Sequence, residues 1–159
     1  MEFRIINIIG LSVTQVDATA IFKLGTVAGD IGGYGPQKNY KYVQYEAGTA
    51  AVAGVAGEVA YYYGAGGTGT NIVTSDLSDS KNIGAGVLQA VMADGTYGWV
   101  QISGPATLTI ALSAGADGNA LTPVGAADGT LDVSAAVTDA VCAYADDISE
   151  KKIMCAFPA

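Results

Sequence analysis

An unbroken alternation of apolar and polar residues from Thr107 to Ser113 constrains the fold more than any other feature of the sequence. Leu108, Ile110 and Leu112 fall on one side of this alternation, and small or polar residues fall on the other. Because successive side chains of a β-strand point to opposite faces, the pattern predicts a strand with one buried and one exposed face.

The residues on either side of this segment extend the prediction. Trp99 to Ile102 is typical of a strand, which Gly104-Pro105 should end because proline cannot donate to a ladder. Two Asp-Gly pairs follow, Asp117-Gly118 and Asp128-Gly129, and such pairs tolerate the positive φ of tight hairpins. The stretch therefore predicts a β-meander with short turns.

The composition favours the same class. The chain has 159 residues, the length of one ordinary domain, and 22 of them are glycine, while charged residues make up only 14%. Short alternating runs of Ala, Val, Thr and Gly suit small strands and many turns, not long helices. We expect an all-β protein.

We expect residues 1–35 to form an N-terminal arm and residues 36–159 to form the β-domain. The arm is apolar near its start, and Gly25 to Pro36 is a glycine-rich connection that predicts no regular structure. An arm this apolar must be buried, because large exposed apolar patches are uncommon. It either completes the sheet of its own domain or lies against a partner.

Two tyrosine-rich runs, Tyr40 to Tyr45 and Val59 to Tyr63, predict further strands. In the first, Tyr40, Tyr42 and Gln44 share one face. Tyrosine rings with polar tips can form a recognition surface, and they are equally ordinary strand residues. We favour the structural role for them.

A weak internal repeat relates residues 57–103 to residues 118–157. Val87 to Ala90 aligns with Val141 to Tyr144, and Trp99 to Ile102 aligns with Ile153 to Ala156 at the same offset. Each half would then contain a hairpin with an acidic turn. Ser134 to Ile148 also fits a helical stripe, so helix is the alternative to strand there.

Charge excludes some partners. The net charge is −8, from 15 acidic and 7 scattered basic residues, so we expect no direct binding of nucleic acid. The longest charge-free window, Gly95 to Ala116, contains Pro105 and alternates as a sheet does, so we expect no membrane span. We also expect a soluble protein without a signal segment.

No arrangement of residues predicts catalysis. The chain has no histidine, the commonest general base and metal ligand. Gly64 to Gly69 lacks the lysine of a phosphate-binding loop, and the acidic residues are spaced as turns rather than as a calcium loop. Cys142 and Cys155 could pair across a hairpin, and we favour buried free thiols. We expect no enzyme, no cofactor and no metal.

Several segments resemble the small decoration (cement) proteins of tailed-bacteriophage heads. Phe22-x-Leu24-Gly25-Thr26 and the Tyr40 to Tyr45 segment resemble their N-terminal part. Ile83 to Ala90, Tyr97 to Ala106 and Gly118 to Pro123 resemble their later strands and turns. The likeness covers residues from about Ile21 to the C-terminus, and the apolar arm before Phe22 and the tyrosine- and glycine-rich segment from Gly29 to Tyr45 depart from it.

The resemblance implies a compact β-barrel or β-sandwich of short antiparallel strands on the outer surface of a mature phage head. Such proteins commonly form homotrimers and clamp subunits of the major capsid protein together. The chain would be made in the host cytoplasm and reside in the virion. For contacts with the capsid or between subunits, we nominate the apolar residues of the arm and its connection: Phe3, Ile5, Ile6, Ile8, Ile9, Leu11, Phe22 and Tyr34.

Two other functions compete with this one. A receptor- or glycan-binding module of a head fibre or tail would use the tyrosines Tyr61 to Tyr63 as its recognition surface. A small enzyme of unusual type would need a titratable residue inside a deep pocket.

Overall fold

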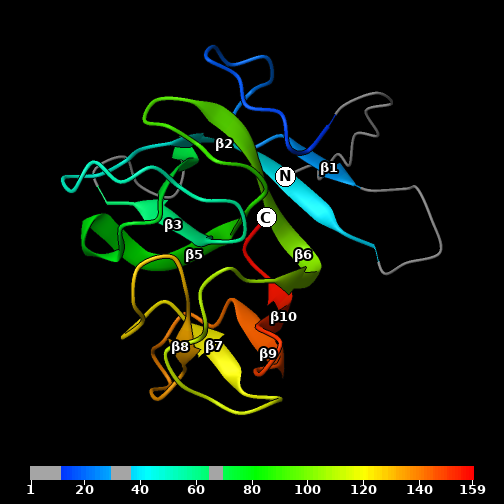
Figure 1. Cartoon of the computed structure of the whole chain (residues 1–159), viewed down its shortest axis with the longest axis vertical. Helices are drawn as coiled ribbons and strands as arrows, with labels where there is room; N and C mark the ends of the chain where they lie inside the picture. Colours follow the sequence, from blue (N-terminus) through cyan, green and yellow to red (C-terminus); the bar gives the residue numbers. More distant parts are fainter. Residues whose placement is uncertain (1–11, 30–36, 65–69) are drawn as a thin grey trace.

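A computed structural model describes residues 12–29, 37–64 and 70–159 of the chain (Figure 1). It contains ten strands and one short 3-10 helix, so the all-β prediction is confirmed. The strands are β1 (Val27–Gly29), β2 (Asn39–Tyr45), β3 (Val59–Tyr63), β4 (Ile72–Thr74), β5 (Ser80–Leu88), β6 (Tyr97–Thr107), β7 (Ala120–Thr122), β8 (Asp132–Val133), β9 (Ala143–Asp147) and β10 (Lys152–Ala156), and the 3-10 helix is η2 (Leu77–Asp79).

The first half of the molecule is a closed barrel of five strands. Their order is β2-β4-β3-β5-β6, and the pairing of β6 with β2 closes the ring. The pairing of β2 with β4 is parallel, and every other strand pairing in the described chain is antiparallel. Strand β1 pairs with the remaining part of the β2 edge that β4 leaves open.

Strand β6 joins the two halves. Its residues up to Ser103 pair with β2, and the part from Ser103 to Thr107 pairs with β10 (Figure 1). The sheet then continues through β9 and β7 to β8. One long strand therefore belongs to both halves of the molecule.

The two halves share a strand pattern. In chain order, β3 pairs with β4 and β5, and β5 pairs with β6; likewise β7 pairs with β8 and β9, and β9 pairs with β10, all antiparallel. The alignment at constant offset nevertheless equates Trp99 with Ile153, and these two lie in different hydrophobic clusters. The sequence duplication stays a prediction.

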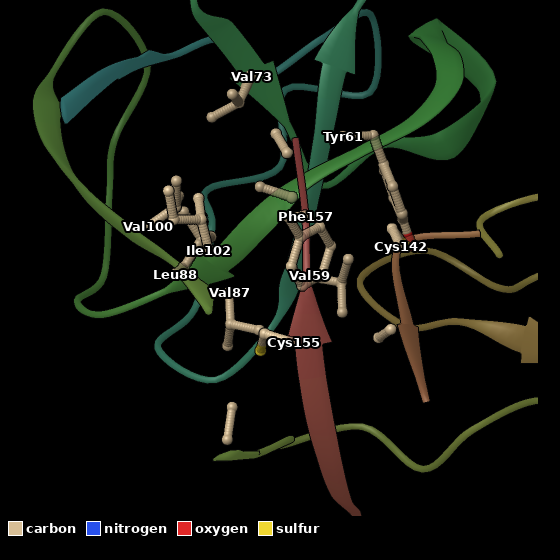
Figure 2. Close-up of a cluster of buried hydrophobic side chains, with 14 of the residues drawn as sticks. Val59, Tyr61, Val73, Val87, Leu88, Val100, Ile102, Cys142, Cys155 and Phe157 are labelled. Carbon is tan, nitrogen blue, oxygen red and sulfur yellow. The ribbon is translucent and has the colours of Figure 1, made fainter. Parts of the chain in front are cut away.

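The main hydrophobic core draws side chains from both halves. Figure 2 shows Val59, Tyr61 and Val87 of the first half beside Cys142, Cys155 and Phe157 of the second. Val59, Tyr61 and Ile153 are fully buried. Because this cluster is continuous, we expect the halves to fold as one cooperative unit.

The tyrosine-rich strands follow the predictions closely. Both predicted runs lie in strands, β2 and β3, and Tyr40 and Tyr42 share the outer face of β2 while Val43 and Tyr45 face the core. Within Ser134 to Ile148 only residues 143–147 form a strand, β9 (Ala143–Asp147), and residues 134–142 are neither strand nor helix, so the strand prediction is confirmed for the β9 part alone. The turn between β9 and β10 begins after Asp147, whose carboxylate accepts hydrogen bonds from Ser149 Oγ and the Glu150 amide.

Three local predictions were wrong. Only Thr107 of the Thr107 to Ser113 segment lies in a strand, although Leu108 and Leu112 are buried as the alternation requires. The amides of Leu108, Thr109 and Ser113 instead donate to Lys151, Gly57 and Leu131. No single neighbouring strand pairs with this segment in the described structure, so the alternation does not become a ladder.

The strand that begins at Tyr97 does not end at Gly104-Pro105. Pairing with β2 stops at Ser103, so Pro105 lies where β6 has only β10 as a partner among the described strands. Proline is tolerated at such an edge position. The glycine-rich connection also contains regular structure, since residues 27–29 of it form β1.

The Asp-Gly pairs form tight turns, with positive φ at Gly118 and Gly129. Asp128-Gly129 lies in the loop between the paired strands β7 and β8, whereas Asp117-Gly118 precedes β7 with no paired strand before it. The two predicted turns of the meander are therefore present, but the strand predicted before Asp117-Gly118 is not.

Candidate interaction surfaces

An aromatic cluster covers the outer face of β2 and β6. Phe22 packs edge-on against Tyr42, with ring centroids 5.4 Å apart, and lies 5.7 Å from Trp99. Trp99 is 1% exposed, and Val13 and Leu24 pack against the same group. Residues 13–24 therefore lie against the domain of their own chain.

Hydrogen bonds fix this segment at a second point. Asp17 and Tyr97 exchange backbone hydrogen bonds of 2.8 and 2.9 Å. The Tyr42 hydroxyl donates to Asp17 Oδ2 at 2.8 Å and accepts from the Ile21 amide. Burial, with the Asp17 carboxylate close by, raises the pKa of Tyr42 to about 12. This part of the arm is an anchored layer over the barrel.

The nominated contact residues have different outcomes. Phe22 is half-buried in the aromatic cluster just described, so most of its surface contacts its own chain. Phe3, Ile5, Ile6, Ile8, Ile9, Leu11 and Tyr34 lie outside the described residues. For them the contact stays a prediction.

Tyr61 and Tyr62 of β3 are buried in the protein. Tyr61 is fully buried, and its hydroxyl accepts from the Thr130 amide at 2.9 Å and donates to the Thr130 carbonyl oxygen. Tyr62 is 3% exposed, and only Tyr63 is half-buried. The structural role predicted for Tyr61 and Tyr62 agrees with this burial.

Lys41 is a buried cation that the sequence did not reveal. It is 3% exposed, and its Nζ donates to the Tyr62 hydroxyl at 2.5 Å and to the Pro158 carbonyl oxygen at 3.1 Å. Neither acceptor carries a negative charge, and burial lowers the pKa of the ammonium group. The contact connects β2 to the residues that follow β10.

The two cysteines are free and buried, as predicted. Burial raises the pKa of Cys142 and of Cys155 to about 12 in each case. Thiolates are the reactive form of cysteine, so both thiols should be inert in the folded protein.

The acidic residues serve turns and loops. Asp94 accepts from the Ala47 amide, Asp117 from the Ile148 amide and Asp128 from the Leu77 amide. Asp79 accepts from the Thr49 amide, which lowers the pKa of this exposed carboxyl group. Within residues 12–29, 37–64 and 70–159, no three side chains of Asp, Glu, Cys or His gather closely enough to hold a metal ion.

Among the exposed apolar side chains of the described surface, which also include Val16, Ile21, Val124, Val137 and Val141, two sets consist of neighbours. Val52, Val55 and Val91 are 50%, 41% and 62% exposed on neighbouring loops of the first half. Tyr144 and Met154, which are directly paired on β9 and β10, are 48% and 42% exposed on the second half. Neither set could be assembled from the sequence, because each depends on strand register.

Comparisons with protein-family models, with curated proteins and with solved structures gave no match. The described part of the chain also has no helix with the length and hydrophobicity of a transmembrane span.

Proposed function

We propose that this chain is a structural virion protein that binds the outside of a tailed-phage head and stabilises the mature capsid by bridging subunits of the major capsid protein. One observation carries the proposal. Three of the segments that resemble decoration proteins, which contain Phe22, Tyr42 and Trp99, are distant in sequence and meet in one aromatic cluster.

That cluster suits a bridging protein for a physical reason. It fixes residues 13–24 to a closed barrel, so the apolar sequence from Glu2 to Leu11 immediately precedes an anchored segment. An anchored binding segment loses less conformational entropy when it binds than a free one does. Several weak contacts on neighbouring subunits then gain strength through effective concentration.

The first test is the copy number of the chain in purified particles. Quantitative mass spectrometry against the major capsid protein should give a count of the same order as the capsid subunits. A handful of copies per particle would indicate a fibre, vertex or tail component instead, and absence from the particle would remove the virion function.

The second test uses heads that lack the chain. The purified protein should co-sediment with these heads and raise the temperature at which they release DNA. Deletion of residues 2–11 should abolish binding while the urea midpoint of the domain stays unchanged. Undiminished binding of the deletion variant would show that the arm is not the attachment segment.

A further inference from the structure

The exposed valines of the first half form a paired apolar surface. Gly54 and Met92 exchange backbone hydrogen bonds of 2.9 and 3.0 Å as an antiparallel bridge. Both of these residues are buried, so their neighbours Val55 and Val91 face the opposite side, directly across from each other. Ala53 and Ala93, one step beyond the bridge, are also exposed.

Contacts with the barrel fix the loop that carries Val52 and Val55. The Tyr45 hydroxyl donates to the Val52 carbonyl oxygen at 3.1 Å, and the Val52 amide donates to the Ala47 carbonyl oxygen. A Cβ atom at Gly54 would lie 2.5 Å from the Leu88 side chain and 2.8 Å from the Tyr45 ring, so the loop approaches the barrel as closely as glycine permits. A surface fixed in this way loses little entropy on binding.

Acidic residues outnumber basic ones around the valines. Glu46, Glu58 and Asp94 are the acidic residues closest to them along the chain, and Lys81 is the only basic residue between Tyr42 and Glu150. Glu58 and Asp94 accept backbone hydrogen bonds from Val55 and Ala47, which places two of these carboxylates at the two loops. Lys151 also lies nearby, because its Nζ donates to the Thr109 carbonyl oxygen and Thr109 is hydrogen-bonded to Ala56 and Gly57. An acidic rim repels nucleic acid, anionic lipid and a second acidic copy of the same surface.

The second half does not supply a complementary face for a second copy. Lys151-Lys152 is the only basic pair of the chain, and Asp146, Asp147 and Glu150 lie beside it in the same hairpin. The net charge there is also negative. Another protein that presents apolar side chains with lysine or arginine around them therefore fits this surface better than a second copy does.

We propose that the surface formed by Val52, Val55 and Val91 docks onto such an apolar, basic-rimmed patch of the capsid subunit. This inference rests on the proposed function and adds a contact on the folded domain to the one nominated for the arm. The apolar pair contributes the buried contact area, and the acidic rim contributes selectivity and the rate of association.

Binding to heads that lack the chain tests the surface. Val91→Asp should weaken binding by about 10-fold or more, because a charge is buried against an apolar patch. The matched control is Val137→Asp, which makes the same change at a fully exposed valine of the second half and should bind as the wild type does. If Val91→Asp unfolds in urea at a lower midpoint, Val91→Ala replaces it and should still weaken binding several-fold.

The salt dependence of binding tests the role of the acidic residues around the valines. Wild-type binding should weaken as salt rises, and Glu58→Gln, which keeps an oxygen acceptor for the Val55 amide, should weaken binding and flatten this dependence. Glu150→Gln changes the net charge equally in the exposed turn before β10 and should keep the wild-type dependence.

The outcomes separate the two proposals. Wild-type binding with unchanged affinity of the folded Val91 variants would overturn the surface and leave the proposed function standing. Failure of the wild type to bind any head would overturn the proposed function and this surface together.

Discussion

The two halves of the molecule share one strand pattern but differ in how the outer faces of their sheets are covered. In the first half, the outer face of β2 and β6 is covered by residues 13–24, which bury Tyr42 and Trp99. In the second half, Tyr144 and Met154 on the outer side of β9 and β10 stay exposed. The first half therefore carries an additional layer over β2 and β6, and in the described structure Tyr144 and Met154 of the second half have no such cover.

The largest expected effect tests the covering layer. Trp99→Ala should lower the free energy of unfolding by about 3–5 kcal/mol, because it leaves a cavity under Phe22 and beside Tyr42. Met154→Ala on the uncovered face should change it by less than about 0.5 kcal/mol. Urea unfolding of both variants measures the difference, and equal losses would mean that the layer contributes no stability.

A smaller effect tests the connection between the halves. Tyr61→Phe should cost about 1–3 kcal/mol, because the Thr130 amide and carbonyl group lose their buried partner. Tyr144→Phe, an exposed control on β9, should change the free energy of unfolding by no more than about 0.5 kcal/mol. If Tyr61→Phe is as stable as the wild type, the hydrogen bonds across the halves are dispensable.

The next prediction concerns pH and the buried cation. Burial lowers the pKa of Lys41 in the folded protein below the value of about 10.4 in the unfolded chain. The unfolded chain then binds more protons as pH rises toward that value, so the Lys41 contribution to stability increases with pH.

Lys41→Met removes this contribution. The free energy of unfolding of the wild type, relative to this variant, should grow as pH rises toward the unfolded-chain pKa of about 10.4. Burial also raises the pKa values of Tyr42 and Tyr62, and the effect of these shifts on stability has the opposite sign. Lys152→Met, at an exposed position, should follow the wild-type profile, and parallel profiles for all three proteins would contradict the prediction.

The smallest expected effect is the difference between the urea midpoints that two intrinsic probes report. Trp99 is the only tryptophan and reports on the first half, whereas Cys142 and Cys155 report on the second. Because β6 and the core belong to both halves, tryptophan fluorescence and thiol labelling should give the same urea midpoint. Labelling that precedes the loss of fluorescence would show that the second half opens alone.

The strands that depend on local pattern could be predicted from the sequence. Val59 to Tyr63 is β3 with the predicted bounds, and the Tyr40 to Tyr45 run differs from β2 by one residue. The passage of β6 through Pro105 could not be predicted, because whether proline faces a partner is a property of the assembled sheet. The prediction of a strand from Thr107 to Ser113 was wrong for a similar reason, because the sequence does not show whether a neighbouring strand is available to pair with it.

The candidate surfaces were harder to predict than the strands. Phe22 is nominated from the sequence as a contact with the capsid or between subunits, and its packing beside Trp99 of its own chain could not be predicted because it depends on the assembled barrel. The Val55 and Val91 pair depends on the register of Gly54 with Met92. The buried charge of Lys41 depends on an acceptor at Pro158, which is far away in sequence.

The pairing of β6 with strands from both halves also determines when, during synthesis, the sheet can be completed. During synthesis, β2 and β5 exist before β6 is made, but the partner of its last residues, β10, comes more than forty residues later. Until then the segment from Ser103 to Thr107 offers unpaired backbone groups to any neighbouring chain. We therefore expect slow folding, typical of sheets with distant pairings, and a requirement for the complete β10 before the nascent chain escapes aggregation.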